Sequence, residues 1–110
     1  MSVEILIVDD NSDIRNILNE LLLDAGYKTR IAANYNQALS EIDKKIPDVA
    51  ILDVKLDKGD NDGIELLSHI KSKNKDVPVI IITGTFLFFF LIWFKSSIPS
   101  VSPLSNFTSI

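Results

Sequence analysis

Three carboxylates stand at the ends of short apolar segments in this sequence. Asp9 and Asp10 end the segment "VEILIVDD", and Asp53 stands near the end of "DVAILDV". Nearly continuous apolar runs of this length are typical of strands that are buried on both faces. Thr83 ends a further segment of this kind, "VPVIIIT". Because ligands of an open α/β sheet bind beyond the carboxyl ends of its strands, we expect these side chains to gather at one edge.

The convergence of the carboxylates matters more than any one of them, because a lone carboxylate at a strand end is commonly solvated or caps a helix. Like charges held close together are unfavourable unless a cation neutralises them. Mg²⁺ is bound in proteins through one or two carboxylates, together with other oxygens and waters. The sequence therefore predicts an acidic pocket that binds Mg²⁺ and a phosphoryl group.

Between the apolar segments, apolar residues recur at helical spacing. The first helix is expected after Asn11 or Ser12, either of which can cap its start. Gly26 can end this helix in the left-handed conformation. The residues expected on its inner face are Ile14, Ile17, Leu18, Leu21, Leu22 and Ala25.

Asn34 and Gln37 form a capping-box pattern, which predicts the start of a second helix. A third helix is expected at "GIELLSHIKSK". Helices between apolar strands imply parallel pairing through right-handed crossovers. The predicted fold class is therefore α/β, with an open parallel sheet and helices on both faces. The residues expected on the inner face of the third helix are Ile64, Leu67 and Ile70.

The composition excludes several classes of site. The 110 residues carry a formal net charge of -4, which argues against a general nucleic-acid surface because such a surface is basic. The sequence contains no cysteine, so disulfides, thiolate catalysis and cysteine zinc sites are excluded. The first residues, "MSVEILIVDD", do not have the pattern of a secretory signal, and a cytoplasmic location is expected.

Several motifs, in order and at domain spacing, resemble the receiver domain of bacterial two-component response regulators, the CheY-like superfamily. They are "ILIVDD" before a helix, "VAILDV", "DGIELL" at the start of the third helix, and "VPVIIITG". The resemblance implies the flavodoxin-like receiver fold and a phosphoacceptor role in a phosphorelay, as a regulator rather than an enzyme. It also implies a sensor histidine kinase as the phosphodonor.

The resemblance assigns roles to the residues of the predicted pocket. It implies that Asp53 is the phosphoacceptor. It implies that Asp9, Asp10 and Asp53 bind Mg²⁺ together with the backbone carbonyl of Lys55, and that Thr83 is the switch hydroxyl that bonds the phosphoryl group. These residue types suit the chemistry, because a carboxylate is a competent nucleophile and Mg²⁺ neutralises the charge of the transferring group.

The segment between Asp53 and Gly63 contains "LDKGDND" and is longer than in common receivers. It is similar to the NtrX type of nitrogen-regulation receivers. In that type the receiver precedes an ATPase module and a helix-turn-helix module that binds DNA, and neither pattern occurs in these 110 residues. We therefore expect no direct nucleic-acid binding by this chain.

The resemblance ends near Gly84, so the fold is expected to be incomplete, with four strands and three helices followed by an atypical apolar tail. Receivers of the family have five strands and five helices, and the fifth strand ends in a lysine that pairs with the phosphoryl group. Lys95 is the only basic residue after Gly84, and its context, "WFKSSIP", does not match. Phosphotransfer to Asp53 is therefore expected to be impaired.

Residues 1–84 are thus expected to form a truncated receiver, and residues 85–110 a divergent tail rich in Phe, Ile and Ser. Three interpretations of the tail stay open. A membrane segment is one, although the ten residues Thr85–Phe94 are too few for a helical span. A substitute fifth strand or helix that packs against the open sheet is the second. A change of coding frame after Gly84 is the third, and it is compatible with the second.

Other functions also stay open on the sequence alone. The chain could be an interaction module that docks a partner without phosphorylation, or a remnant without function. A Mg²⁺-dependent phosphohydrolase is a further alternative, but such enzymes commonly place two Asp two residues apart, whereas Asp9 and Asp10 are adjacent. Without a fifth strand, the segment "VIIIT" would be an exposed edge, so self-association through the incomplete sheet is expected.

Overall fold

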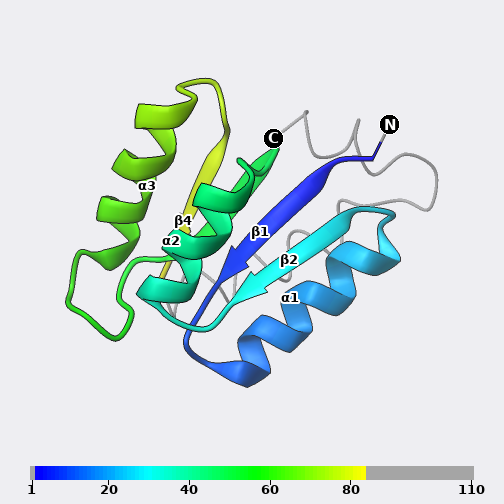
Figure 1. The fold of residues 1–110 in the computed structure, drawn as a ribbon. Coiled ribbons are helices and arrows are strands. Elements are labelled where there is room, and N and C mark those ends of the chain that lie inside the picture. Colours follow the sequence, from blue (N-terminus) through cyan, green and yellow to red (C-terminus); the bar gives the residue numbers. More distant parts are fainter. Residues whose placement is uncertain (1, 84–110) are drawn as a thin grey trace.

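The computed structural model describes residues 2–83 of the chain, and these residues form one parallel sheet with helices on both of its faces (Figure 1). The strands lie in the order β2-β1-β3-β4. Their bounds are β1 (Glu4–Val8), β2 (Lys28–Ala32), β3 (Val49–Asp53) and β4 (Val79–Ile82). The helices are α1 (Ser12–Asp24), α2 (Tyr35–Lys44) and α3 (Asp62–Lys73). The expected open α/β fold, with four strands and three helices through residue 83, is confirmed.

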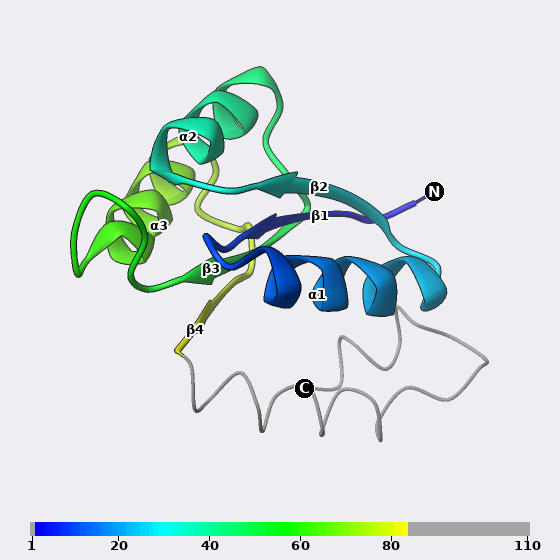
Figure 2. The same cartoon turned by 90° about the horizontal axis from the view of Figure 1, so that it is seen from below.

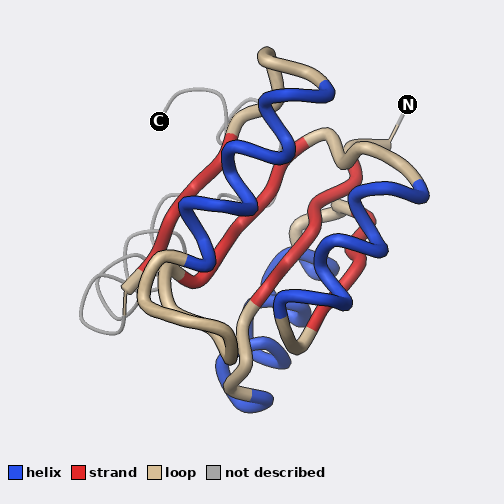
Figure 3. The backbone as a smooth tube through the Cα atoms, turned by 60° about the vertical axis from the view of Figure 1, so that its left-hand side comes forward, coloured by secondary structure: helices blue, strands red, loops and turns tan. Residues whose placement is uncertain are grey.

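The sheet separates two apolar layers. Figure 2 shows α1 on one side of the sheet and α2 with α3 on the other, and Figure 3 shows the same layering along the backbone. The core on the α1 side consists of Ile5, Ile7, Leu18, Leu22, Ala25, Tyr27, Val49, Ile51 and Ile82. The core on the α2 and α3 side consists of Leu6, Val8, Ala32, Ala38, Ile42, Ala50, Leu52, Leu56, Leu66, Ile70 and Val77. Successive strand residues thus alternate between the two layers, which explains why β1 and β3 are apolar at nearly every position.

The predicted helix ends are confirmed. The Asn11 side chain accepts hydrogen bonds from the backbone N–H groups of Asp13 and Ile14 at the start of α1. Gly26, just beyond the end of α1, has a φ of 96°, a conformation that favours glycine. The Asn34 side chain accepts a hydrogen bond of 2.8 Å from the backbone N–H of Gln37 at the start of α2. These contacts fix where each helix leaves the sheet.

Two of the predicted inner-face residues are wrong. Ile17 is 46% exposed and Ile64 is 44% exposed. In α1 the buried residues are Leu18 and Leu22, and each helical position turns by about 100°, so Ile17 lies on the flank of the helix. In α3 the inner face follows Leu66 and Ile70, which turns Ile64 toward solvent. The sequence thus predicts both helices correctly, but not which side of each helix faces the sheet.

β2 and β4 are the outermost strands of the sheet that residues 2–83 form. Within these residues, no helix is both long enough and apolar enough to cross a membrane. The expectations for Lys95 and for residues 85–110 lie outside the described residues.

Candidate metal and phosphoryl site

The sheet order places two of the acidic segments side by side. β1 pairs directly with β3, and Val8 lies opposite Leu52, so the residues that follow them point beyond the same edge. Asp9, Asp10 and Asp53 each offer a carboxylate oxygen, and these oxygens lie within 4.8 Å of one another. The predicted convergence of the three carboxylates is therefore present in the structure. Figure 1 shows the arrowheads of β1 and β2 pointing to this edge.

Asp9 is held rigidly, since its side chain is buried and its backbone is bonded on both sides. Its residue exposure is 2%, and its N–H donates to the carbonyl of Ala32 over 3.2 Å. Its Oδ1 accepts a hydrogen bond of 2.9 Å from the N–H of Asn11. Arg15, one turn into α1, donates from Nη1 to the Asp9 carbonyl over 2.8 Å. The turn that carries Asp9 and Asp10 is thus fastened to both β2 and α1.

The pKa values of the buried Asp9 and the half-buried Asp53 are raised. Burial raises the pKa of Asp9, while the Asn11 N–H and the Arg15 guanidinium act in the opposite direction. Burial, and next the negative charge of Asp9, raise the pKa of Asp53 to about 6. The N–H of Lys55, 3.4 Å from Asp53 Oδ1, and the N–H of Val54 lower this pKa but do not offset the two effects that raise it. The site therefore holds more negative charge than its own residues stabilise.

Gly63, at the start of α3, packs directly against the backbone that carries Asp53. A Cβ atom at this position would lie 2.4 Å from the carbonyl oxygen of Asp53 and 2.8 Å from Cα of Val54. The N–H of Gly63 also donates to the carbonyl of Val54 over 3.0 Å. Any side chain larger than hydrogen would push α3 away from β3. Sequence reasoning placed Gly63 at the helix start but missed this close approach.

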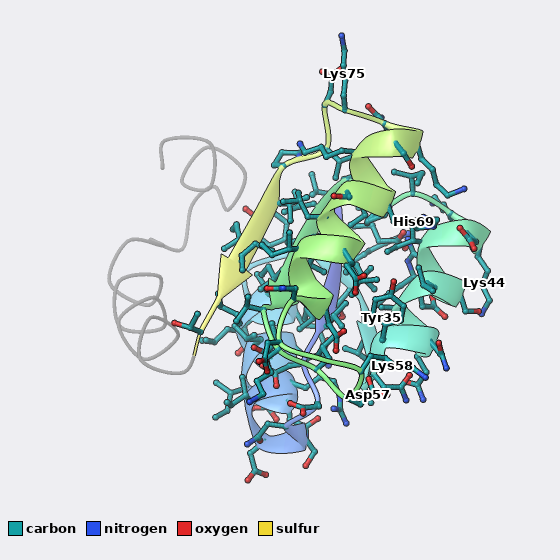
Figure 4. The ribbon with its side chains drawn as sticks, turned by 90° about the vertical axis from the view of Figure 1, so that its left-hand side faces the viewer. Tyr35, Lys44, Asp57, Lys58, His69 and Lys75 are labelled. Carbon is teal, nitrogen blue, oxygen red and sulfur yellow. The ribbon has the colours of Figure 1, made fainter. Side chains whose placement is uncertain are left out.

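The loop between β3 and α3 is anchored by acids that sequence reasoning described only as polar. Asp62 is 1% exposed, and its Oδ2 accepts hydrogen bonds from the N–H groups of Lys58 and Gly59 over 2.8 and 2.9 Å. Asp57 accepts a hydrogen bond of 2.9 Å from the N–H of Tyr35, which ties the loop to the start of α2. Figure 4 shows Asp57 and Lys58 beside Tyr35. The spacing Asp-x-x-x-x-Asp from Asp57 to Asp62 was the available signal, but it does not reveal which acid turns inward.

Thr83 directly follows β4 and is exposed. Its preceding residue, Ile82, lies opposite Asp53, and the Ile82 carbonyl accepts a hydrogen bond of 3.1 Å from the N–H of Val54. Thr83 therefore belongs to the strand next to Asp53 and to the same edge of the sheet. Lys55 lies two residues beyond Asp53, and its ammonium group is 3.4 Å from the carboxylate of Asp60.

The donor set fits a hard divalent cation. Carboxylate oxygens from two neighbouring strand ends are the ligands that Mg²⁺ prefers, and a cation would remove the repulsion that raises the pKa of Asp53. Among residues 2–83, no basic side chain forms an ion pair with Asp53: Lys55 pairs with Asp60, and Arg15 contacts the Asp9 backbone. The arrangement can thus hold a cation with a nucleophilic carboxylate beside it.

Comparison with known proteins agrees with this geometry. The sequence profile of the response regulator receiver domain matches residues 5–86. The nitrogen assimilation regulatory protein NtrX of Azorhizobium caulinodans is 42% identical over 84 residues, which are 76% of this chain and 18% of NtrX. Sporulation initiation phosphotransferase F of Bacillus subtilis is 45% identical over 84 residues, which are 76% of this chain and 66% of that protein. The chain thus spans only about a fifth of its NtrX relative.

A solved structure shows the same fold. The response regulator TrrA of Thermotoga maritima, crystallised with Mg²⁺ and BeF, superposes with a TM-score of 0.67 at 34% identity, and the match covers 74% of this chain and 69% of TrrA. The matched profile covers most of the chain, including both strands that carry the acidic cluster. The chain therefore belongs to the family of response regulator receiver domains.

Proposed function

We propose that this chain accepts a phosphoryl group on Asp53 as the receiver of a two-component phosphorelay. The observation that carries the proposal is the cluster of Asp9, Asp10 and Asp53, in which the carboxylate oxygens lie within 4.8 Å of one another. Asp53 is partly buried, and its pKa is raised to about 6. Its carboxylate is a competent nucleophile, and a neighbouring cation would stabilise its charged form. The receiver family to which the chain belongs supports this role.

Asp9, Asp10 and Asp53, with the backbone carbonyl of Lys55, would hold Mg²⁺. Bound there, the ion would neutralise charge on the phosphoryl oxygens. The chain's own contribution is the fixed position of the ligands. Asn11 and Arg15 hold Asp9 from both sides, so the first carboxylate is oriented before the ion arrives. The TrrA relative was crystallised with Mg²⁺ and BeF, which supports a Mg²⁺ site in this chain.

In the transfer step, a carboxylate oxygen of Asp53 would attack the phosphorus of a phosphohistidine. The new P–O bond forms as the P–N bond breaks, the electron pair returns to the imidazole nitrogen, and Asp53 becomes an acyl phosphate. The phosphodonor of this class is a sensor histidine kinase. The hydroxyl of Thr83, on the neighbouring strand end, would then bond one of the new phosphoryl oxygens.

Transfer by this chain is expected to be slow. Within residues 2–83 no cationic side chain pairs with Asp53, so in this part of the chain Mg²⁺ alone would balance the charge of the phosphoryl group. Preorganised cations at a transferring phosphoryl group account for a large part of catalysis. We therefore expect phosphorylation of Asp53 to occur at a lower rate than in receivers that carry the additional lysine.

The test uses the full chain with Mg²⁺ and a small acyl phosphate, and follows the mass of the intact protein. Phosphorylation should appear slowly, should require Mg²⁺ and should disappear in Asp53→Asn. Asp60→Asn is the matched control, because Asp60 lies in the same loop but its side chain is 82% exposed. Phosphorylation that persists in Asp53→Asn would place the acceptor elsewhere. A complete lack of phosphorylation, while Mg²⁺ still raises the melting temperature, would leave a metal-binding domain without acceptor activity.

A further inference from the structure

The two faces of the described sheet are covered unequally. On one face α2 and α3 lie side by side, and their contacts reach β2, β3 and β4 (Figure 2). On the other face α1 is the only described helix, and its main contacts are with β1 and β2. An α-helix is about 10 Å wide, and adjacent strands are about 4.8 Å apart, so one helix covers roughly two strands. Among residues 2–83, no helix lies mainly over the half of this face that β3 and β4 form.

The flank of α1 that borders this half is apolar. Asn19 on the other flank accepts a hydrogen bond from Thr29 of β2, which fixes the rotation of the helix. Ile17 therefore faces away from β2, toward β3 and β4, and is 46% exposed. Ile14, Leu21 and Ile80 of β4 pack at the margin of the core on the same side and are only partly buried. We name Ile14, Ile17, Leu21 and Ile80 the β4-side flank.

An apolar segment follows β4 closely in the sequence. Phe86–Phe94, "FLFFFLIWF", contains nine residues, none of them polar or charged. It begins three residues after Thr83, where β4 has just ended. Three residues reach about 10 Å, which is the distance across one helix layer.

The length of the segment also matches. Nine residues in a helix span about 14 Å, and the four residues of β4 span about 13 Å. A helix of this length that ran back along β4 would therefore match the length of the strand. A covalent linker this short gives the segment an effective concentration in the millimolar range, which favours its own flank over that of a second molecule. We propose that Phe86–Phe94 docks on the β4-side flank of the same chain, beside α1.

Trp93 provides the test, because it is the only tryptophan of the chain and lies in the proposed docking segment. In the full-length chain, Trp93 emission should be blue-shifted and poorly quenched by acrylamide. Ile17→Glu should shift the emission to the red and at least double the quenching constant. Leu23→Glu is the matched control, because Leu23 is on the same helix, is 50% exposed and lies on the opposite flank. It should leave Trp93 emission unchanged.

Circular dichroism of both variants checks that the fold persists, and Ile17→Ala with Leu23→Ala repeats the comparison if the charged variants unfold. Equal emission shifts in the Ile17 and Leu23 variants would overturn the proposal. A Trp93 signal that depends on protein concentration would assign the segment to a second copy instead. A blue shift that appears only with added phosphatidylcholine vesicles would assign it to a bilayer. Both of the last outcomes contradict docking within the chain, and neither depends on phosphorylation of Asp53.

Discussion

The Asp53 carboxyl group links the geometry of the pocket to the stability of the whole domain. Its pKa is 3.8 as a reference and about 6 in the folded chain. The folded state therefore binds the proton more tightly, and the stability that Asp53 contributes is present below about pH 4 and is lost as the pH rises through about 6. Without divalent cations, the free energy of unfolding should fall over this interval.

Replacing Asp53 by Asn should remove the loss of stability that the charged Asp53 carboxylate causes at neutral pH. At pH 7.5 without Mg²⁺, we expect Asp53→Asn to raise the free energy of unfolding by about 1–2 kcal/mol, after allowance for solvent screening of a partly exposed group. Urea unfolding between pH 4.5 and 8 measures the difference, which should shrink toward the acid end. Asp60→Asn, with its 82% exposed side chain, should change little at any pH. A variant less stable than the parent at pH 7.5 would show that the cluster is not strained by its own charge.

Gly63 tests the contact between α3 and the strand end that carries Asp53. Gly63→Ala would place a Cβ atom 2.4 Å from a backbone carbonyl that cannot move aside freely. We expect a loss of about 1–3 kcal/mol in the free energy of unfolding, the range for overpacking a well-packed site. Gly59→Ala is the control, since the nearest atom to its Cβ would be 4.0 Å away. Thermal unfolding of the two variants gives the comparison, and equal melting temperatures would contradict the close approach.

At the scale of elements, the loop between β3 and α3 depends on one buried carboxylate. Asp62→Ala removes the acceptor for the N–H groups of Lys58 and Gly59, and these groups would lose their partner in a partly buried place. We expect the free energy of unfolding to fall by about 1.5–3 kcal/mol, the range for hydrogen bonds to a charged group. Amide hydrogen exchange at Lys58 and Gly59 should accelerate locally. Asp60→Ala, in the same loop but exposed, should leave both amides protected.

The elements themselves were largely predictable, because they follow from local rules. The helix ends are predictable because a cap depends only on residues that are close in the sequence. Asn11 and Asn34 cap the starts of α1 and α2, and Gly26 follows the end of α1, as the sequence predicts. Ile17 and Ile64 were misplaced because helical periodicity leaves the rotation of a short helix uncertain by one position. That rotation is decided by long-range contacts, such as the bond from Thr29 of β2 to Asn19 of α1. The role of Asp62 was hidden for the same reason, since burial of a loop carboxylate depends on the path of the whole loop.

At the scale of the whole molecule, the site exists because of strand order. Asp9 and Asp53 are 44 residues apart in the sequence, and they meet because β1 and β3 are neighbours in the order β2-β1-β3-β4. Because two apolar strands end in aspartates, the sequence predicts that these aspartates lie at the same edge of the sheet. The adjacency of these two strands, and hence the distance within 4.8 Å, required the three-dimensional arrangement. The raised pKa of Asp53 is thus a property of the assembled sheet.

The assembled sheet should respond to Mg²⁺ as a unit. A cation that binds the folded chain alone stabilises it by about 2.7 kcal/mol at a concentration one hundred times its Kd. We expect Mg²⁺ to raise the melting temperature of the full chain, with a larger effect at pH 7.5 than at pH 5, because protons compete for Asp53 below about pH 6. Asp9→Asn should abolish most of the response. Asp24→Asn, at the far end of α1 from the cluster, should retain it. An equal Mg²⁺ response in both variants would show that the ion binds outside the three-carboxylate cluster, and a response independent of pH would show that Asp53 is not among its ligands.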